Sequence, residues 1–428
     1  GIPILPFLRM GIFFGVMLIF IIFNKPRVPL LVMVLLICLM GQALQTRMHL
    51  RPYIFNFIFI QLFFVTLLHY EKVKNFNRLL WLLPLGIIWI NTHLGAFYYA
   101  TIIFFVFVLE HVTALLNHIF QKGKGKASLK VFLNPILHYA VIIIVYYACF
   151  LVNPYGVRGG LYPFQVFFDP NHIKLYAFNA FIFEQQPPAY IITFKGFWFY
   201  GIVALYGVSF YFSPKKNFRN ILLFLIGFFL FLYTQRMSVY FVLITSYLIV
   251  ENFQDIPDRI SQYFNPLKPI SMITITAIFF SLSAFNWNER ALDVHPKGIF
   301  PELDPTIPFK TVQTLERDGY QGTVFNFDRY GGYLLWESYP TLQPFIDGRQ
   351  LNNEAWQDYR LLVSFPDELW HFFQDKYQFR IAMIDLTAPF CGKILITLHA
   401  SPQWQEYKIE GTTLTFVRKA IDVKTHKN

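Results

Sequence analysis

Apolar residues fill the first two thirds of the chain in long stretches that short polar segments separate. A helix needs about 20 consecutive apolar residues to cross ~30 Å of hydrocarbon. Ten stretches reach or approach this length, so the pattern predicts about ten membrane spans within residues 1–286. The predicted spans are residues 4–23, 28–45, 52–70, 79–92, 94–110, 135–152, 193–212, 219–234, 237–251 and 269–286.

The pattern changes after residue 286. Short apolar runs alternate there with turn residues, and residues 353–376 repeat large apolar side chains at helical spacing. The predicted strands are residues 324–327, 344–347 and 380–386, and a closing hairpin is predicted from residues 406–409 and 413–418. The sequence therefore predicts an α-helical polytopic membrane protein with a C-terminal α/β domain over residues 287–428.

Composition supports this division. The chain is 55% hydrophobic, 20% aromatic and only 14% charged, whereas soluble domains carry roughly a quarter charged residues. Residues 1–286 hold 21 Lys and Arg against 7 Asp and Glu, and residues 287–428 hold 15 against 18. The positive charge lies in short loops between apolar spans, which favours anchoring in a lipid bilayer over binding of nucleic acid.

The basic residues also predict an orientation, because cytoplasmic loops are enriched in Lys and Arg. The richer set of alternate loops contains Lys25, Arg27, Lys72, Lys74, Arg78, Lys122, Lys124, Lys126, Lys130, Lys215, Lys216, Arg219, Arg259 and Lys268. The poorer set contains Arg47, Arg51, Arg158, Lys174, Lys195 and Arg236. With ten spans, this bias places Gly1 and the C-terminal domain outside the cytoplasm. No signal-peptide pattern precedes the first span, and we expect the natural N-terminus to lie upstream of Gly1.

Two acidic residues fall in the long outer loop of residues 153–192. Glu184 and Asp169 are the predicted outer carboxylates of the membrane region, whereas Glu71, Glu110, Glu251, Asp255 and Asp258 fall at the cytoplasmic side. Carboxylates at this position are candidates for acid or base catalysis. For Glu184, a structural role in interfacial solvation or helix capping explains the carboxylate as well as catalysis does. For Asp169, the structural role explains it better.

Polar and basic groups form a second candidate set on the same side. Arg51, Asn91, His93, Arg158 and Arg236 all lie in or beside predicted outer loops. Arginine side chains that converge suit a phosphate or pyrophosphate, whose oxygens accept paired hydrogen bonds. The alternatives are anchoring of the arginines to phospholipid headgroups and a packing role for His93.

In the C-terminal region, each of two predicted strands runs into a glycine-containing turn beside an aspartate. Asp328 precedes Gly331 and Gly332, and Asp347 lies two residues before Arg349. Ligands bind at such strand ends in α/β folds, but turn capping by the two aspartates is equally consistent with the pattern. The spacing of His, Asp and Glu matches no metal motif, and the three cysteines encode no disulfide framework.

Several short motifs occur in an order that resembles a family of bacterial polytopic membrane proteins with a GT-C-type glycosyltransferase-like architecture. The matching stretches are Arg-Pro at 51–52, Trp-Ile-Asn-Thr-His-Leu-Gly at 89–95, Asn-Pro-Tyr-Gly at 153–156, Glu-Gln-Gln-Pro-Pro at 184–188, residues 326–336 and Phe-Ile-Asp-Gly-Arg at 345–349. This sequence departs from the family pattern at Leu94, Gln185 and Pro187, while Glu184 and Gln186 are retained.

The resemblance implies a function at the bacterial cytoplasmic (inner) membrane. It implies a sugar donor linked to polyprenyl phosphate, with Gln186 among the residues that contact substrate. A catalytic acid in a first outer loop is typical of related enzymes, and the corresponding region would precede residue 4. No cofactor is indicated by the sequence, and a requirement for a divalent metal stays open.

Two functions are consistent with these observations. The first is transfer of a sugar from a lipid-phosphate donor to an extracytoplasmic acceptor, with Glu184 as the acid or base and Arg51, Arg158 and Arg236 as phosphate ligands. The second is a non-enzymatic membrane subunit that binds or assembles lipid-linked glycans. Transport is less consistent, because the spans carry few central charges and show no sign of inverted repeats.

Overall fold

The structure is a computed structural model and consists of two compact units, residues 1–296 and residues 297–428. It describes residues 5–24, 28–45, 47–48, 51–93, 97–120, 128–168, 187–188, 196–254, 307–348, 353–388 and 390–419. The described residues are mostly helical in the first unit and form a small sheet domain in the second.

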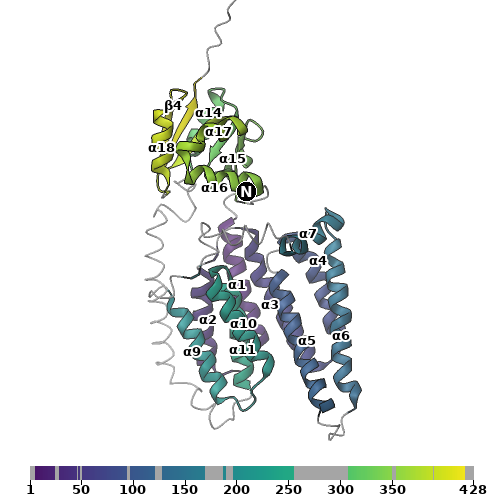
Figure 1. The fold of residues 1–428 in the computed structure, drawn as a ribbon. Helices are drawn as coiled ribbons and strands as arrows, with labels where there is room; N and C mark the ends of the chain where they lie inside the picture. The colour runs from purple at the N-terminus through teal and green to yellow at the C-terminus, as the bar shows by residue number, and fades with distance from the viewer. Residues whose placement is uncertain are drawn as a thin grey trace, which may run out of the picture. The chain divides into compact units, whose positions relative to one another are not determined.

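The helices of the first unit run mostly along one common direction, with α7 lying across the others at one end (Figure 1). They are α1 (Leu5–Asn24), α2 (Leu30–Gln45), α3 (Asn56–Val73), α4 (Leu82–Thr92), α5 (Phe97–Phe120), α6 (Leu129–Ala148), α7 (Gly156–Phe168), α9 (Phe197–Phe212), α10 (Phe218–Tyr233) and α11 (Ser238–Gln254). Short 3₁₀ turns join several of them, namely η2 (Pro52–Phe55), η3 (Phe76–Trp81), η5 (Cys149–Leu151) and η10 (Gln235–Met237).

Four segments among the described residues are long and apolar enough to cross a membrane. They are Phe7–Asn24, Pro52–Val73, Tyr99–Phe120 and Leu129–Leu151. The helices α2, α9 and α10 are apolar but shorter, and the predicted span at residues 269–286 lies outside the described residues. The membrane character of the chain is therefore supported, and the predicted number of about ten spans is not confirmed.

The helix α11 forms the centre of this unit. Its residues from Ser238 to Val250 are all buried, and it packs against α9, α10, α2 and α3. A helix that is buried on every side needs apolar side chains all round, which explains why its sequence shows no polar stripe. By contrast α6 exposes Val131, Leu137 and Ile144, as a lipid-facing helix does.

The connections between helices gather at two opposite ends of the unit. We call the first the Arg236 end, where α2, α4 and α10 finish and α3 and α11 begin. The second is the Arg219 end, where α3, α5 and α11 finish and α6 and α10 begin. The loops predicted to lie outside fall at the Arg236 end, and those predicted to be cytoplasmic fall at the Arg219 end.

The second unit is built on a five-stranded sheet in the order β2-β1-β3-β5-β4. The strand β1 pairs in parallel with β2 and β3, and β5 pairs antiparallel with both β3 and β4. Its elements are α14 (Phe309–Arg317), β1 (Gly322–Asn326), α15 (Asp328–Glu337), β2 (Leu342–Pro344), α16 (Asn353–Ser364), α17 (Pro366–Tyr377), β3 (Phe379–Asp385), α18 (Cys391–Ala400), β4 (Trp404–Glu410) and β5 (Thr413–Arg418).

This arrangement corrects three details of the predicted domain. The second strand ends at Pro344, where it was expected to begin. The helix predicted over 353–376 is two helices, because Pro366 disfavours helical geometry at Phe365 and then starts α17. Gly331 and Gly332 lie inside α15 rather than in a turn, since the chain turns directly from β1 into that helix.

Candidate functional site

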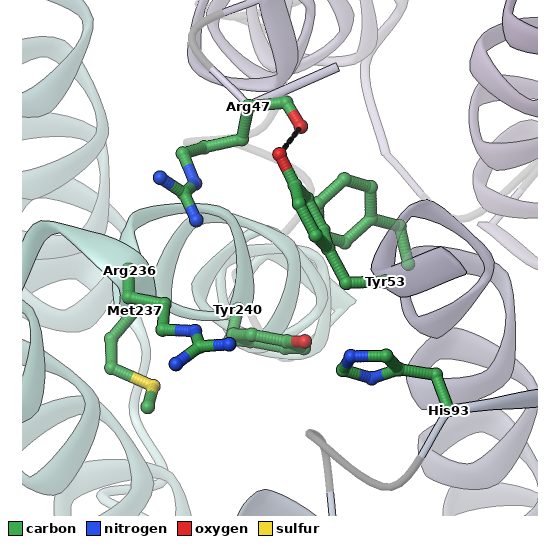
Figure 2. Close-up of a pocket in the computed structure, with 7 residues that line it drawn as sticks. Arg47, Tyr53, His93, Arg236, Met237 and Tyr240 are labelled. Atoms are coloured by element: carbon green, nitrogen blue, oxygen red, sulfur yellow. Dashed lines mark hydrogen bonds between the residues drawn. The ribbon is translucent and has the colours of Figure 1, made fainter. Parts of the chain in front are cut away.

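A small pocket opens at the Arg236 end of the first unit. Figure 2 shows the guanidinium groups of Arg47 and Arg236 extending into the same space beside the ring of Tyr240. The cavity volume of the pocket is about 20 Å³. Its lining residues are Arg47, Tyr53, Phe57, His93, Arg236, Met237 and Tyr240. Three connections of the helical bundle, α2–α3, α4–α5 and α10–α11, therefore contribute to one site.

Arg47 is held at the pocket by the residues that follow α2. Its side chain lies over the ring of Tyr53, with 5.2 Å from the guanidinium carbon to the ring centroid. The hydroxyl of Tyr53 donates a hydrogen bond of 2.8 Å to the carbonyl oxygen of Arg47. Only 7% of Arg47 is exposed, so its charge is placed in a largely desolvated environment. Electrostatic attraction to an anion is stronger there than at an open surface.

Asn56 connects three residues around the pocket from a fully buried position at the start of α3. Its Oδ1 accepts a hydrogen bond of 2.8 Å from the indole Nε1 of Trp89. Its Nδ2 lies 2.9 Å from His93 Nδ1 and 3.2 Å from the hydroxyl of Tyr240. Because an indole N–H can only donate, the contact with Trp89 fixes which end of the amide is the oxygen.

The same contacts define the tautomer of His93. The amide Nδ2 can only donate, so His93 Nδ1 accepts, and a neutral ring then carries its proton on Nε2. Burial, together with the neighbouring Arg236 guanidinium, lowers the pKa of His93 to about 4. His93 is therefore neutral at physiological pH, with its proton on Nε2.

Arg236 is placed by the connection between α10 and α11. Thr234 caps the 3₁₀ turn η10, and its hydroxyl oxygen accepts a hydrogen bond of 3.3 Å from the Arg236 amide. Tyr240 follows on the first turn of α11, and its ring stacks on Tyr99 with 4.7 Å between centroids. Short caps and ring packing thus set the positions of both pocket residues from this connection.

The chemistry of the lining favours an anion. Two guanidinium groups, two tyrosine hydroxyls and a neutral histidine are the polar side chains of the pocket, and no Asp or Glu is among its lining residues. Phosphate oxygens accept paired hydrogen bonds from guanidinium groups and single bonds from hydroxyls. The described lining offers ligands for phosphate but no carboxylate that could act as a base.

The residues predicted from sequence fall into three groups. His93 and Arg236 line the pocket. The second group lies outside the lining. Arg51 and Arg158 are exposed. Asn91 donates hydrogen bonds to the carbonyl oxygens of Ile87 and Val152 and so joins α4 to the end of η5. The third group lies outside the described residues, and its members are Asp169, Glu184, Gln186 and Arg349.

The motif in the second unit has a packing role at Gly331. A Cβ added at this position would lie 2.2 Å from the carbonyl oxygen of Ile346 and 2.7 Å from the Cα of Asp347, so only glycine lets α15 approach that segment. The buried side chain of Asn326 also bonds to Ile346 and Phe345. Asp328 is exposed at the start of α15, and Asp347 follows β2.

Sequence reasoning did not select Arg47, Tyr53, Asn56 or Tyr240 as site residues. Arg47 and Tyr53 lie within six residues of each other, on either side of the Arg-Pro motif, and that spacing is the one local signal for them. Tyr240 and Asn56 lie at the starts of apolar helices, where nothing in the local sequence distinguishes them from residues of the core.

No group of His, Cys, Asp and Glu in the described residues is arranged to hold a metal ion. Comparison with protein-family models and with curated proteins gives no match to this chain.

Proposed function

We propose that this protein is a membrane glycosyltransferase-like protein, which transfers a sugar from a polyprenyl-phosphate donor to an extracytoplasmic acceptor at the bacterial inner membrane. The pocket at the Arg236 end binds the donor phosphate. The observation that carries the proposal is the convergence of Arg47 and Arg236 with Tyr53, Tyr240 and the Nε2–H of His93.

Each ligand has a separate role in this proposal. The two guanidinium groups neutralise the phosphate charge, and the Tyr240 hydroxyl and His93 direct its oxygens. Tyr53 and Phe57 give the pocket an aromatic wall, which suits an amphipathic donor whose phosphate lies next to a hydrocarbon chain. Glu184 is the proposed acid or base of the transfer, with Asp169 as the second candidate.

Binding of the donor can be measured separately from transfer. The probes are farnesyl phosphate, as a short polyprenyl phosphate, and inorganic pyrophosphate, each titrated into the detergent-purified full chain. We expect Arg47→Met and Arg236→Met to weaken binding by about tenfold or more each, because each removes a charge-assisted hydrogen bond. Arg78→Met is the matched control, since Arg78 is exposed and lies outside the lining.

Equal affinity in all four proteins would contradict a phosphate site in this pocket. Transfer is then tested with Glu184→Gln and Asp169→Asn, by the level of surface glycan in cells that carry only the variant. Loss of glycan with unchanged donor binding supports a catalytic role for the substituted carboxylate.

A second function is favoured by one specific observation. The lining is suited to an anion but includes no carboxylate base, which is the composition expected of a binding or assembly subunit for lipid-linked glycans. Normal glycan levels in the double variant Glu184→Gln/Asp169→Asn, together with loss in Arg236→Met, would favour this second function over sugar transfer.

A further inference from the structure

The Arg219 end contains a buried group of ionisable side chains that the proposed function does not use. Arg219, of which 4% is exposed, lies with its Nη2 2.7 Å from Glu251 Oε2 and its Nη1 3.7 Å from Glu110 Oε2. Close by, Glu71 Oε1 accepts hydrogen bonds from the Tyr139 hydroxyl at 2.7 Å and pairs with His111 Nε2 at 2.9 Å. We call this set the Arg219 network.

Five helices meet in the network. Glu71 comes from α3, Glu110 and His111 from α5, Tyr139 from α6, Arg219 from α10 and Glu251 from α11. The backbone explains part of the arrangement, because Asn217 caps α10 and so places Arg219 in its first turn. The ring of Phe107 lies 4.8 Å from the guanidinium carbon and shields it from solvent.

The charges in the network do not balance. Glu71, Glu110 and Glu251 bring three carboxyl groups, whereas Arg219 and Lys74, which pairs with Glu71, bring two permanent positive charges. One more positive charge is needed for neutrality. Ionisable groups at membrane depth are costly unless they are neutralised, so a proton is the expected balancing charge.

Two observations place that proton on Glu110. The Oε2 atom of Glu110 is fully buried and has no hydrogen-bond partner among the described residues, whereas Glu71 and Glu251 each have a close donor. The groups that face Glu110 are Arg219 and Glu251 across from α5, Glu71 with Lys74 at the end of α3, and His111 beside it. The Glu110 side chain is 24% exposed, so a proton can exchange with solvent.

We infer that the Arg219 network is a proton-binding site, in which Glu110 takes up one exchangeable proton and thereby holds α5 against α10 and α11. Uptake adds a proton to the Glu110 carboxylate, and release returns it to water. Deprotonation leaves an uncompensated carboxylate in the network, and its repulsion from Glu71 and Glu251 weakens this contact. The inference is independent of sugar transfer.

The sign of the pH response follows from where the proton is held. If folded Glu110 keeps a proton that an unfolded glutamate loses near pH 4.3, then stability is greatest at low pH and declines as pH rises. We expect the unfolding temperature of the full chain in detergent to fall by about 2–4 °C between pH 6 and 8.5, which corresponds to about a tenfold change in the unfolding equilibrium.

Glu110→Gln is the decisive variant, because it keeps the shape of the protonated side chain and removes its titration. We expect it to flatten the pH profile and to be more stable than the wild-type protein at pH 8.5. Glu337→Gln is the matched control, since Glu337 is exposed at the end of α15, outside the network, and its removal should leave the slope of the pH profile unchanged.

An ordinary ion pair gives the opposite result. If Glu110→Gln lowers the unfolding temperature equally at all pH values, or if His111→Gln and not Glu110→Gln flattens the profile, the assignment of the proton to Glu110 is wrong. Infrared difference spectra between pH 6 and 8.5 give a second readout. The band of a protonated carboxyl group should disappear in the wild-type protein as pH rises, and no such change should occur in Glu110→Gln.

Discussion

The two ends of the helical unit surround a buried arginine with different kinds of side chain. At the Arg219 end, the guanidinium group faces the carboxyl groups of Glu251 and Glu110 of the same protein. At the Arg236 end, Arg47 and Arg236 share a pocket whose other polar lining residues are two tyrosines and a neutral histidine. An arginine matched by carboxylates within the chain stabilises the fold, whereas arginines among neutral hydrogen-bond donors are suited to an external anion.

The largest expected effect is on stability. Arg219→Met leaves the Glu251 carboxylate largely buried without its cation, and breaking a buried pair in this way costs about 3–5 kcal/mol. Arg236→Met removes a ligand of an anion pocket, and we expect a cost below about 1 kcal/mol. Thermal unfolding of both variants in the same detergent compares the two ends directly. If the two variants were destabilised equally, Arg219 and Arg236 could not be assigned the different roles of stabilising the fold and binding an anion.

An intermediate effect is expected from the amide that organises the pocket. Asn56→Leu leaves the Trp89 indole N–H and His93 Nδ1 buried without their partner, which costs about 1–3 kcal/mol. It also frees the His93 ring, so binding of farnesyl phosphate should weaken severalfold even though Asn56 does not line the pocket.

Asn77→Leu is the control for this substitution, because Asn77 is exposed near the opposite end of α3. If Asn56→Leu lowered stability and left binding unchanged, the amide would have no part in positioning His93.

The smallest expected effect concerns the pH response of the pocket. Since the pKa of His93 is about 4 in the folded protein and about 6.5 in an unfolded chain, the unfolded state binds the proton first as pH falls. The contribution of neutral His93 to the free energy of unfolding is complete above pH 6.5 and is lost as the pH falls from 6.5 to 4. The sign is opposite to that expected for the Arg219 network.

Unfolding temperatures of the wild-type protein and His93→Gln between pH 4.5 and 7 test this sign. The two curves should converge as pH falls, because only the wild-type protein loses the contribution of His93. A wild-type protein that gained stability relative to the variant on acidification would show that His93 is protonated in the pocket.

Much of the architecture could be predicted from the sequence because apolar runs and helical spacing are local signals. Nine predicted spans contain a helix in the described parts of the chain, and the hairpin of β4 and β5 was predicted close to its observed ends. Helix limits were less accurate. The predicted span ending at residue 110 stops short of the end of α5, which continues to Phe120, because Glu110 and His111 interrupt the apolar run without ending the helix.

The site was predictable only in part. The Trp-x-Asn-x-His motif drew attention to His93, but local sequence could not show that Asn91 ties α4 to η5 while Trp89 holds Asn56. These contacts join residues 33 to 61 positions apart. Likewise, Glu71, Glu110 and Glu251 could be placed on one side of the membrane from the sequence, but their meeting around Arg219 depends on how five helices pack.

The amide of Asn56 has a consequence for how related chains can vary. It satisfies an indole N–H, a ring nitrogen and a hydroxyl at once; the first two partners come from the end of α4 and the third from α11. A substitution at position 56 alone removes one hydrogen bond from each of three neighbouring side chains. Positions 56, 89, 93 and 240 are therefore expected to change together or not at all. In an alignment of relatives they should form one covarying set, whereas exposed Arg51 and Arg158 should vary independently of it.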